Sequence, residues 1–449
     1  MAVFHLKKGR NIKLKGAASK ETIAMPLPKK AAVTPPSFCG LKPRLAVKVD
    51  DLVKVGSPIL TDKEVEGLKV LSPASGKVVA INRGEKRVLL EVVIETDGLQ
   101  ESEDFQTFGE QELRSIAREK AIKALLEGGL WPSLRQRPFS KIANPSDKPK
   151  SIFVHAMNTE PLALDVDIAL ENKEREFQAG LNVIKSLTDG EVHLCTAADT
   201  KSKALNEAQN VQIHSFRGPH PTGNVSTHIQ HVDPINKGDL IWYLEAHDVA
   251  RIGLLFLNGH YPVERIIAIT GEGAKNKIYA KTIEGAPFSL LLQGSSLEGM
   301  CCISGSVLTG RNVGPNGFVH FYDSQITVIP QGGKRELLGW LVPGFNKYTF
   351  SHTYASAFFP KKEYSLSTDT HGGDRAIVLN HIYDSLISLD IMTYFLMKAV
   401  ISGEVEEAEK LGILECDAED FALCDFACPS KMDISGIIRQ GLEVIEKEG

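Results

Sequence analysis

Several common catalytic motifs are missing from this sequence. It contains no GxSxG, HExxH or Walker A motif and no complete GxGxxG. Each of these motifs places a nucleophile, a zinc ion or a phosphate group by a defined local geometry, so their absence removes the usual sequence evidence for such sites. The nearest approach, around Gly271 and Gly273, lacks the third glycine and a following helix. We expect a plain turn there, and neither a nucleophile–base pair nor a phosphate cradle is evident.

The sequence also lacks a long apolar run. A helix needs roughly 18–20 consecutive apolar residues to cross a bilayer. The nearest candidate, residues 386–401, is interrupted by Asp390 and Lys398. The first sixteen residues contain no apolar core of the kind found in signal peptides. We therefore expect a chain that does not cross a membrane itself, although it could dock on proteins that do.

Neither an excess of positive charge nor a cysteine framework is present. The 51 Lys and Arg residues are outnumbered by 56 Asp and Glu residues, which gives a formal net charge of -5. Phosphate binding needs a basic surface, so nucleic acid is not expected to be a partner. The seven cysteines are odd in number and scattered, which favours a reducing compartment over a disulfide-stapled fold.

The N-terminal part has the pattern of a small β domain. A chain of 449 residues is too long for one core. Short strands are expected at residues 47–55, 59–60, 69–71, 77–81 and 87–95, separated by glycine turns. Their order resembles the barrel-sandwich fold of biotinyl and lipoyl carriers, and we assign it to residues 1–100. Lys63 would then be the candidate carrier lysine, but no Met-Lys-Met is present, and a solvated turn lysine is favoured.

The middle of the chain alternates strands with helices. A helix is expected within residues 102–126, followed by a Pro- and Ser-bearing linker at 143–150. Strands are then expected at 151–157, 191–196, 211–216, 240–244 and 265–270, and helices at 172–187, 202–209 and 247–257. This alternation is typical of a parallel sheet covered by helices. We assign a Rossmann-like α/β domain to residues 101–270.

Two further units are expected after residue 270. Residues 277–309 are mixed and suit a β-grasp (ubiquitin-like, SLBB-like) insert, which with later strands at 325–329, 336–341 and 348–350 makes a domain of residues 271–352. Residues 374–449 have helical patterning. Asp390, the pair Asp417 and Asp420, and Asp433 are candidate helix caps. The expected class is thus a multidomain α/β protein with a helical C-terminal domain.

One short connection, residues 126–142, is unusual in composition. It contains Gly128 and Gly129, a tryptophan, a phenylalanine and several cations within LEGGLWPSLRQRPFSKI. Three uses are open for such a segment. It could hold a flavin or nucleotide, hold another ligand, or pack as a joint between domains.

Two clusters contain residue types that can bind metals. Cys416, Cys424 and Cys428 lie near a Cys-Pro that resembles the end of a ferredoxin run, but the earlier cysteine spacings are missing. Buried, inert cysteines are the better interpretation. The second cluster contains four histidines, namely His214, His220, His228 and His231. No carboxylate or cysteine completes a ligand set, so loop histidines bonded to backbone or water are favoured over a metal site.

Several stretches together resemble the A-subunit family of sodium-translocating NADH:quinone reductases (Nqr). The resemblance covers essentially the whole length. The quoted stretches are KKGRNIKLKG, LSPASGKVVAINRGEKRVL, GLWPSLRQRPFSK, IFVHAMNTEPLA, FRGPHPTGNVSTHI, ISGSVLTGR, ELLGWLVPG and FALCDFACPSK. The family is itself similar to flavin- and NADH-binding subunits of Rnf complexes and respiratory complex I, which carry a loop of the type GxGGAGFPT and cluster-binding cysteines.

Departures from that loop carry a specific implication. Only Gly128 and Gly129 remain, and bulky side chains, including Trp131 and Arg135, stand where glycines would let backbone approach a flavin. The cysteine run at 416, 424 and 428 is broken as well. The resemblance therefore implies descent from a redox module, with loss of both the flavin and the Fe–S cluster.

The resemblance also implies a role. It predicts a peripheral subunit on the cytoplasmic face of the bacterial inner membrane, docked chiefly on a membrane subunit of a complex that reduces ubiquinone with electrons from NADH and exports Na⁺. The complex would use NADH, flavins and an Fe–S centre, and this chain would bind none of them and no metal. Quinone contact is assigned to Trp131, Arg135, Arg137 and Phe139, with a packed joint as the equal alternative. An active NADH-oxidising flavin module and a ligand-free anchor remain the other hypotheses.

Overall fold

The N-terminal β unit consists of two small sheets packed face to face. The computed structural model describes residues 2–333, 336–359 and 362–448. One sheet has the order β3-β9-β8-β5 and the other β4-β6-β7. The strands are β3 (Lys30–Val33), β4 (Pro43–Leu45), β5 (Leu52–Val53), β6 (Pro58–Asp62), β7 (Lys69–Leu71), β8 (Gly76–Arg83) and β9 (Leu89–Thr96). Alternate side chains such as Ile59, Val78 and Val92 are buried between them. Lys63 is exposed in the β6–β7 turn.

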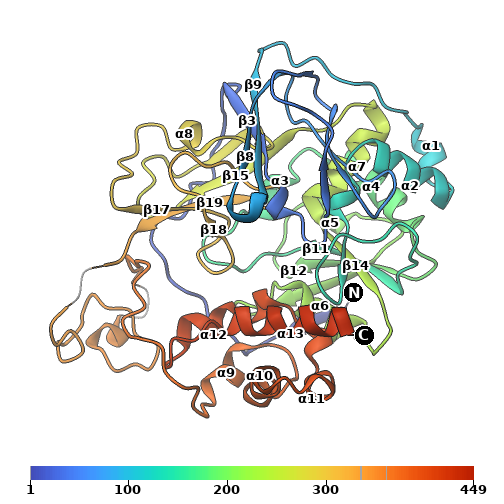
Figure 1. The fold of residues 1–449 in the computed structure, drawn as a ribbon. Coiled ribbons are helices and arrows are strands. Elements are labelled where there is room, and N and C mark those ends of the chain that lie inside the picture. The colour runs from blue at the N-terminus through green and yellow to red at the C-terminus, as the bar shows by residue number, and fades with distance from the viewer. Residues whose placement is uncertain (1, 334–335, 360–361, 449) are drawn as a thin grey trace.

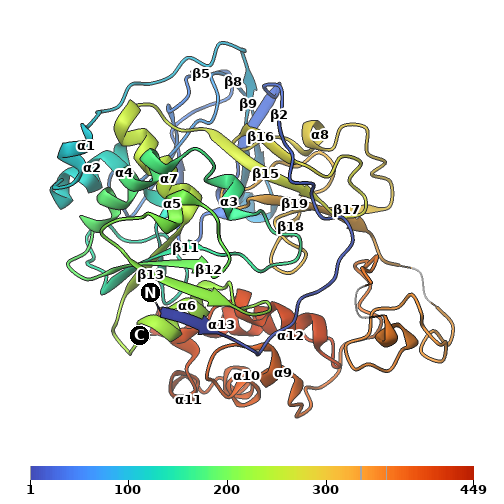
Figure 2. The ribbon, with the colours of Figure 1, turned by 180° about the vertical axis from the view of Figure 1, so that it is seen from behind.

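The first 24 residues do not join this β unit, which differs from the predicted domain of residues 1–100. Strand β1 (Ala2–His5) runs parallel to β13 at the edge of the α/β sheet, and β2 (Thr22–Ala24) runs parallel to β16 at the edge of another sheet. Such short strands bond their backbone groups only by completing an existing sheet edge. The N-terminal arm therefore ties separate parts of the protein together (Figures 1 and 2).

A six-stranded sheet forms the middle of the molecule. Its order is β1-β13-β12-β11-β14-β10, and every pair is parallel except β14 with β10. The strands are β10 (Arg135–Arg137), β11 (Ser151–Ala156), β12 (Val192–Ala197), β13 (Gln212–Arg217) and β14 (Ile241–Glu245). The four predicted strands in this range are confirmed to within two residues. Strands β11 and β14 are mostly apolar and buried along nearly their whole length, as is typical of the central strands of a parallel sheet.

Helices cover both faces of this sheet. The helices are α1 (Glu110–Leu113), α2 (Arg118–Glu127), α3 (Val166–Ala169), α4 (Glu174–Lys185), α5 (Lys203–Asn206), α6 (Val225–Val232) and α7 (Ala246–Asn258). Gly180 of α4 and Gly253 of α7 lie against backbone of the opposite helix, so α4 and α7 pack closely on one face. Helix α6 packs with Phe153 and Phe216 on the other face. The prediction of a histidine-bearing loop was wrong at His228 and His231, which lie on α6.

A fourth sheet, called the third sheet below because it follows the N-terminal β unit and the α/β sheet along the chain, has the order β18-β17-β19-β15-β16-β2. Its elements are β15 (Glu264–Thr270), β16 (Tyr279–Ile283), α8 (Phe288–Leu291), β17 (Met300–Ser304), β18 (Arg311–Asn312) and β19 (Gln325–Pro330). The predicted boundary at residue 270 was wrong for β15, which pairs with β16 and β19 rather than with the α/β sheet. Strand β10 already occupies the edge beside β14 where β15 would have paired. Gly271 forms a turn against Val328, as expected.

The chain after β19 is irregular before it becomes helical. Residues 336–341 and 348–350 are not strands, in contrast to the prediction; a short 3₁₀ turn, η4 (Ala355–Phe358), follows. The helices are α9 (Ile382–Leu386), α10 (Thr393–Ser402), α11 (Val405–Lys410), α12 (Ala422–Ala427) and α13 (Ile434–Glu448). Asp417 and Asp420 form the predicted capping box, here on the 3₁₀ turn η6 (Ala418–Phe421). Asp390 caps no helix, since α10 begins at Thr393.

The four parts surround a central junction. In Figure 1 the N-terminal β unit lies above, the third sheet to the left, the α/β sheet behind, and the C-terminal helices below. None of the helices in the described parts of the chain is long and apolar enough to cross a membrane. The segment 126–142 and η6 meet at the junction between the α/β sheet and the C-terminal helices, as the ion pairs of Arg137 show.

Candidate functional site

Apolar side chains occupy the space beside the two glycines of segment 126–142, where a side chain would otherwise stand. A Cβ atom on Gly128 would lie 2.4 Å from Leu255 of α7, and one on Gly129 would lie 2.3 Å from Leu71 of β7. Gly129 also has a φ of 66°, which favours glycine. These glycines let α2 end tightly between α7 and the N-terminal β unit. Their open sides leave no room for a flavin in this conformation.

Trp131 is a packing residue of the same segment. It lies on the 3₁₀ turn η3 (Trp131–Ser133) and has no exposed surface. Its ring meets that of Trp242 edge to face at 5.6 Å, and its Nε1 donates a hydrogen bond to the carbonyl of Ala143 at 2.7 Å. A buried indole with its N–H bonded is fully satisfied. Trp131 therefore offers no face to a quinone and holds β10 in place.

The two arginines of β10 have different surroundings. The guanidinium of Arg135 lies between two aromatic rings, 4.6 Å from Tyr243 and 4.7 Å from Tyr322. Arg137, with a side chain that is 1% exposed, forms ion pairs with Asp417 at 3.2 Å and with Glu419 at 2.7 Å. Arg135 thus joins β14 to the third sheet through cation–π contacts. Arg137 joins the α/β sheet to the C-terminal helices.

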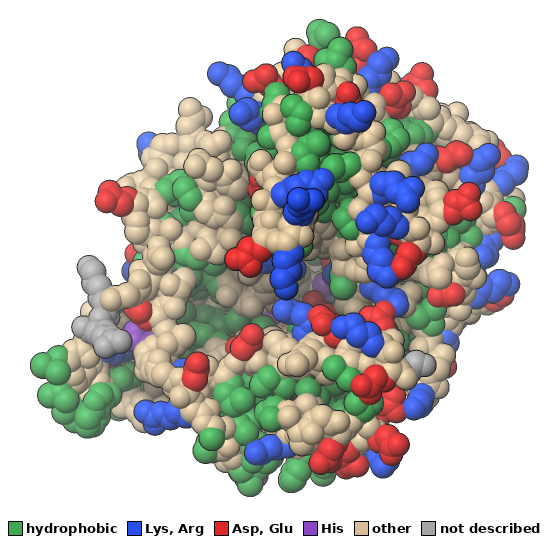
Figure 3. Space-filling view, viewed as in Figure 1, with side chains coloured by type: hydrophobic (Ala, Val, Ile, Leu, Met, Phe, Trp, Pro, Cys, Tyr) green, Lys and Arg blue, Asp and Glu red, His purple; other side chains and the backbone are tan. Residues whose placement is uncertain are grey.

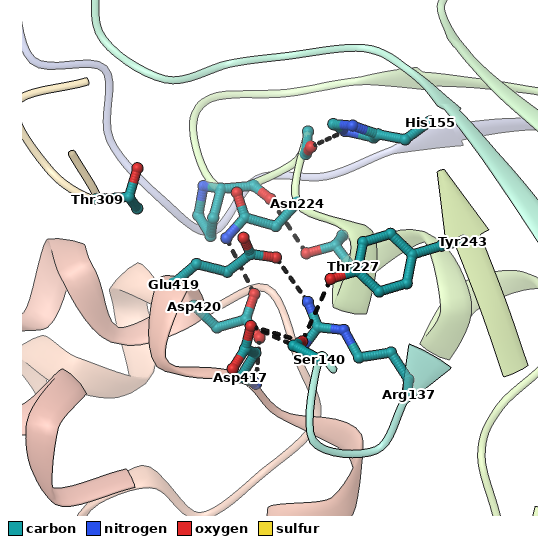
Figure 4. A network of polar contacts seen from close by, with 12 residues as sticks. Arg137, Ser140, His155, Asn224, Thr227, Tyr243, Thr309, Asp417, Glu419 and Asp420 are labelled. Atoms are coloured by element: carbon teal, nitrogen blue, oxygen red, sulfur yellow. Dashed lines mark hydrogen bonds and ion pairs between the residues drawn. The ribbon is translucent and has the colours of Figure 1, made fainter. Parts of the chain in front are cut away.

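The residues around Arg137 form a polar cluster drawn from distant parts of the chain (Figure 4). Ser140 donates to Asp417 at 2.8 Å, and the amide of Asn224 donates to Asp420 at 2.9 Å. The Nε of Arg137 is buried and has no hydrogen-bond partner among the described residues. We name this the Arg137 cluster; its members are Arg137, Ser140, Asn224, Asp417, Glu419 and Asp420.

One cation faces three carboxylates in the Arg137 cluster, and this sets their proton affinities. Burial raises the pKa of Glu419 to about 7, against the opposing effect of Arg137. Burial also raises the pKa of Asp420. The pKa of Asp417 is lowered, because Arg137 and Ser140 outweigh the effect of burial. Glu419 is the group that exchanges a proton near neutral pH, and its side chain is 30% exposed.

A second titratable pair lies at the carboxyl ends of β11 and β14. His155 Nδ1 donates to the Glu245 carboxylate at 2.8 Å, and its Nε2 donates to the carbonyl of Gly223. Burial alone would lower the pKa of His155, but the neighbouring Glu245 outweighs it and the pKa rises to about 8. Strands β12 and β13 extend from β11 on one side and β14 lies on the other, and ligands of open α/β sheets bind where such an order reverses.

The two groups lie near each other and are mostly buried, and the charge of Glu419 acts on His155. Figure 4 shows His155, Asn224, Tyr243 and Glu419 together, with Thr309 of the β17–β18 connection at the side. Figure 3 shows a hollow in the middle of the face above the C-terminal helices, with Lys and Arg side chains gathered along its rim. The arrangement can offer a cation for a developing negative charge and two groups that hold protons near neutral pH.

Matches to known proteins extend over most or all of the chain. Three family profiles match: "NqrA N-terminal barrel-sandwich hybrid domain" at residues 4–97, "NqrA second alpha/beta domain" at 116–261 and "NQRA C-terminal domain" at 266–314. The A subunit of the Na(+)-translocating NADH-quinone reductase from Yersinia pestis bv. Antiqua (strain Angola) is 38% identical over 451 residues, covering 100% of both chains. The chain belongs to the NqrA family.

Further relatives support the same membership. Proteins with the same name from Alcanivorax borkumensis and Klebsiella pneumoniae (strain 342) are 38% and 39% identical over 449 residues, again covering 100% of both chains. A chain in the crystal structure of NAD⁺-reducing [NiFe]-hydrogenase in the air-oxidised state covers 77% of this chain and is covered to 68%, at 11% identity and a TM-score of 0.38. That likeness is too remote to bear on fold or function.

The cysteines of this family member do not fit an Fe–S cluster in the described structure. Cys416, Cys424 and Cys428 are buried in the core of the C-terminal helices. Cys416 Sγ donates to the carbonyl of Gly412 at 3.3 Å, and Cys428 Sγ lies 3.2 Å from the Tyr383 hydroxyl. Burial raises the pKa of Cys424 well above its ordinary value, which opposes thiolate ligation.

The four histidines also do not come together as a metal-binding group in the described structure. His214 pairs with His193 at 3.1 Å, His220 with Thr159 at 3.2 Å, and His231 donates to the carbonyl of Thr227 at 2.9 Å. Across residues 2–333, 336–359 and 362–448, no group of three or more His, Cys, Asp or Glu residues is placed to hold a metal ion. His228 is buried against Phe216 and His155.

Sequence reasoning predicted Arg137 as a site residue but missed most of the polar site. Of the four predicted quinone contacts, Arg137 joins the Arg137 cluster, Phe139 packs half-buried against the C-terminal helices, and Trp131 and Arg135 face other neighbours. His155 and Glu245 were not singled out. The signal was present, because both residues lie at the carboxyl ends of predicted parallel strands. Glu419 had no signal, since its partner lies 282 residues earlier in the chain.

Proposed function

We propose that the chain is a peripheral subunit on the cytoplasmic face of the bacterial inner membrane, in a complex that reduces ubiquinone with electrons from NADH and exports Na⁺. The observation that carries this is the match to A subunits of Na(+)-translocating NADH-quinone reductases over the full length of both chains. Its partners are the other subunits of that complex, chiefly a membrane subunit. NADH oxidation, the flavins and the Fe–S centre belong to those partners.

The proposal includes a division into four units. Residues 30–97 form the barrel-sandwich unit. The parallel order β13-β12-β11-β14 supports a Rossmann-like unit, and the order β16-β15-β19-β17-β18 with its parallel central pair supports a β-grasp unit. The fourth unit is the helical C-terminal domain that supplies Glu419. The quinone-reducing role is assigned to the junction of the second and fourth units.

The junction has the groups that quinone reduction needs. Reduction of a quinone to a quinol takes up two electrons and two protons. The electrons would come from the cofactors of partner subunits. Glu419, partly exposed and with a pKa of about 7, can deliver one of the two protons and be reprotonated from solvent to deliver the other, and Arg137 behind it can stabilise negative charge on a quinone oxygen. Phe139 and Arg135 flank this position on the chain, and Trp131 supports it from the core.

The absence of a flavin and of an Fe–S cluster is part of the proposal, and a visible absorption spectrum tests it. Leu71 and Leu255 fill the space beside Gly129 and Gly128. The cysteines are buried in the core of the C-terminal helices, where Cys428 contacts the Tyr383 hydroxyl. We expect the purified full-length chain to be colourless where flavins and Fe–S clusters absorb. A flavin spectrum that survives gel filtration would favour the alternative, an active NADH-oxidising module of the Rnf or complex I type.

A second function, a ligand-free structural anchor, is favoured by one observation. Trp131 and Arg137 are both buried, and Arg137 pairs with carboxylates of the C-terminal part, as expected for a joint between units. For an anchor, changes at Glu419 would alter assembly of the complex but not turnover of the assembled enzyme. For a quinone site, turnover of the assembled enzyme would change with assembly intact.

A further inference from the structure

Exposed apolar side chains are concentrated in one stretch of the chain. Of the 21 large hydrophobic side chains that are exposed in the described residues, thirteen lie between Leu337 and Ile401 and eight between Leu337 and Phe359. Among described residues, none lies between Gln100 and Glu336. Single exposed apolar side chains are ordinary, whereas a concentration of this kind marks an interaction surface.

The eight side chains belong to one structured loop, here called the aromatic loop (residues 337–359). The chain folds back on itself here, since Ala355 N donates to the carbonyl of Pro343 at 2.8 Å and Lys362 Nζ, just beyond the loop, donates to the carbonyl of Phe345 at 3.1 Å. The rings of Phe345 and Phe359 lie 6.5 Å apart across this closure. Phe345 and Phe359 therefore lie side by side, and the other exposed apolar side chains belong to the same folded loop.

The base of the aromatic loop is anchored to the body of the protein. Arg10 donates to the carbonyl of Phe350 at 3.0 Å and its guanidinium lies 4.4 Å from that ring. Tyr348 packs edge to face on Phe426 of α12 at 5.4 Å. Residues farther from these contacts are exposed: Leu337 is 93% exposed, Phe358 84% and Trp340 71%. In Figures 1 and 2 the loop projects from the lower part of the molecule, beyond the third sheet.

The charge of this segment differs from that of the whole chain. Between Gln331 and Lys362 the sequence has five Lys or Arg residues and a single acidic one, Glu336, although the chain has a formal net charge of -5. Three of the basic residues lie outside the described residues. Exposed Trp and Phe beside Lys and Arg are the composition of segments that enter a membrane interface, where the rings reach the acyl boundary and the cations meet anionic headgroups.

We propose that the aromatic loop inserts into the headgroup region of an anionic lipid bilayer and so fixes this chain against the membrane. The occupant is lipid rather than protein, because the segment is basic on an acidic chain and presents aromatic side chains from a loop rather than a flat packed face. Lipid contact is independent of the proposed quinone role, because it requires neither partner subunits nor electron transfer.

Tryptophan fluorescence of the full-length chain can report this insertion directly. The sequence has three tryptophans; Trp131 and Trp242 are fully buried, so Trp340 is the exposed reporter. Vesicles with a high fraction of phosphatidylglycerol should shift its emission to shorter wavelength and protect it from iodide or acrylamide. Neutral phosphatidylcholine vesicles should bind more weakly, and added salt should weaken binding to the anionic ones.

Matched variants decide whether the loop is responsible. The double variant Leu337→Ser and Phe358→Ser should lower partitioning into anionic vesicles by about tenfold or more, because it removes two large apolar side chains from the inserted surface. Leu52→Ser, at a side chain that is 83% exposed on the N-terminal β unit, should leave partitioning unchanged.

Two outcomes would overturn the proposal. One is a Trp340 emission that stays the same with every vesicle. The other is a chain that binds only to vesicles containing the membrane subunits of the complex, with the loop variants reducing that binding, which would assign the loop to a protein partner.

Discussion

Arg137→Ala is expected to open the joint between the α/β sheet and the C-terminal helices, at a cost of about 3 kcal/mol at pH 8. The guanidinium is 1% exposed and is the cation that pairs with Asp417 and Glu419. Without it, Asp417, Glu419 and Asp420 repel one another at a buried interface. Hydrogen exchange of the backbone amides of η6 and α12 measures the effect, and protection should fall by roughly a hundredfold.

The penalty should be smaller at pH 6. The pKa of Glu419 is raised from its ordinary 4.5 to about 7 in the folded chain. A group with a raised pKa contributes stability that is fully present below 4.5 and is lost as pH rises through about 7. Protonation at pH 6 therefore removes part of the repulsion that Arg137→Ala exposes. The double variant Arg137→Ala with Glu419→Gln should recover part of the loss at pH 8.

An exposed arginine provides the control. Arg175 pairs with Glu110 on the surface, where both side chains are more than half exposed. Arg175→Ala should change protection by less than about 1 kcal/mol, since surface pairs contribute little. If Arg137→Ala were as mild as Arg175→Ala, or equally costly at pH 6 and pH 8, the interpretation of the Arg137 cluster would be wrong.

Trp131→Ala should lower stability by about 3–5 kcal/mol, because it leaves a large cavity in a closely packed core and an unpaired carbonyl on Ala143. For a domain of the size that holds Trp131, this corresponds to a decrease in Tm of roughly 6–20 °C by scanning calorimetry. Trp131 contacts Trp242, so the stability is lost from the core that packs behind β10.

Trp340→Ala is the matched control for the tryptophan change. Its side chain is 71% exposed, and its removal should shift Tm by less than about 2 °C. A Trp131→Ala chain with an unchanged Tm would mean that the space around this residue is not the packed core described above. It would then return Trp131 to the set of ligand-contact candidates.

The parallel strands β11 to β14 were predictable because they alternate with helical segments, and β11 and β14 are also mostly apolar. The short edge strands β10, β1 and β2 were not. The residues of β10, Arg135–Arg137, have no strand composition, and they form a strand only because β14 has a free edge beside them. The same edge pairing removed β15 from the α/β sheet. Strands β1 and β2 depend on partners some 200 residues or more away, beyond the reach of local patterns.

The candidate site was predictable in part. The composition of segment 126–142 indicated a ligand site or a domain joint, and Arg137 of this segment belongs to the polar site. Asp417 and Asp420 were identified only as helix caps, and they do form a capping box while also facing Arg137 and Asn224. Local sequence patterns predict the capping role of these carboxylates. Their contacts with Arg137 and Asn224 cannot be predicted this way, because those residues lie far away in the sequence.

The most direct test of the quinone-reducing role uses the assembled complex with Glu419→Gln, a change that keeps the side chain's size and removes its proton. NADH-driven reduction of a short-chain ubiquinone and of ferricyanide should be compared across pH 6 to 9. Ferricyanide accepts electrons without protons, so it reports the electron path up to the quinone step.

The account predicts that Glu419→Gln lowers kcat for ubiquinone by at least about tenfold and removes an inflection near pH 7, while ferricyanide reduction stays unchanged. Asp189→Asn, at a carboxylate whose side chain is 86% exposed, should change neither rate. Unaltered ubiquinone reduction by an assembled Glu419→Gln complex over the whole pH range would contradict the account and leave this chain as a structural anchor.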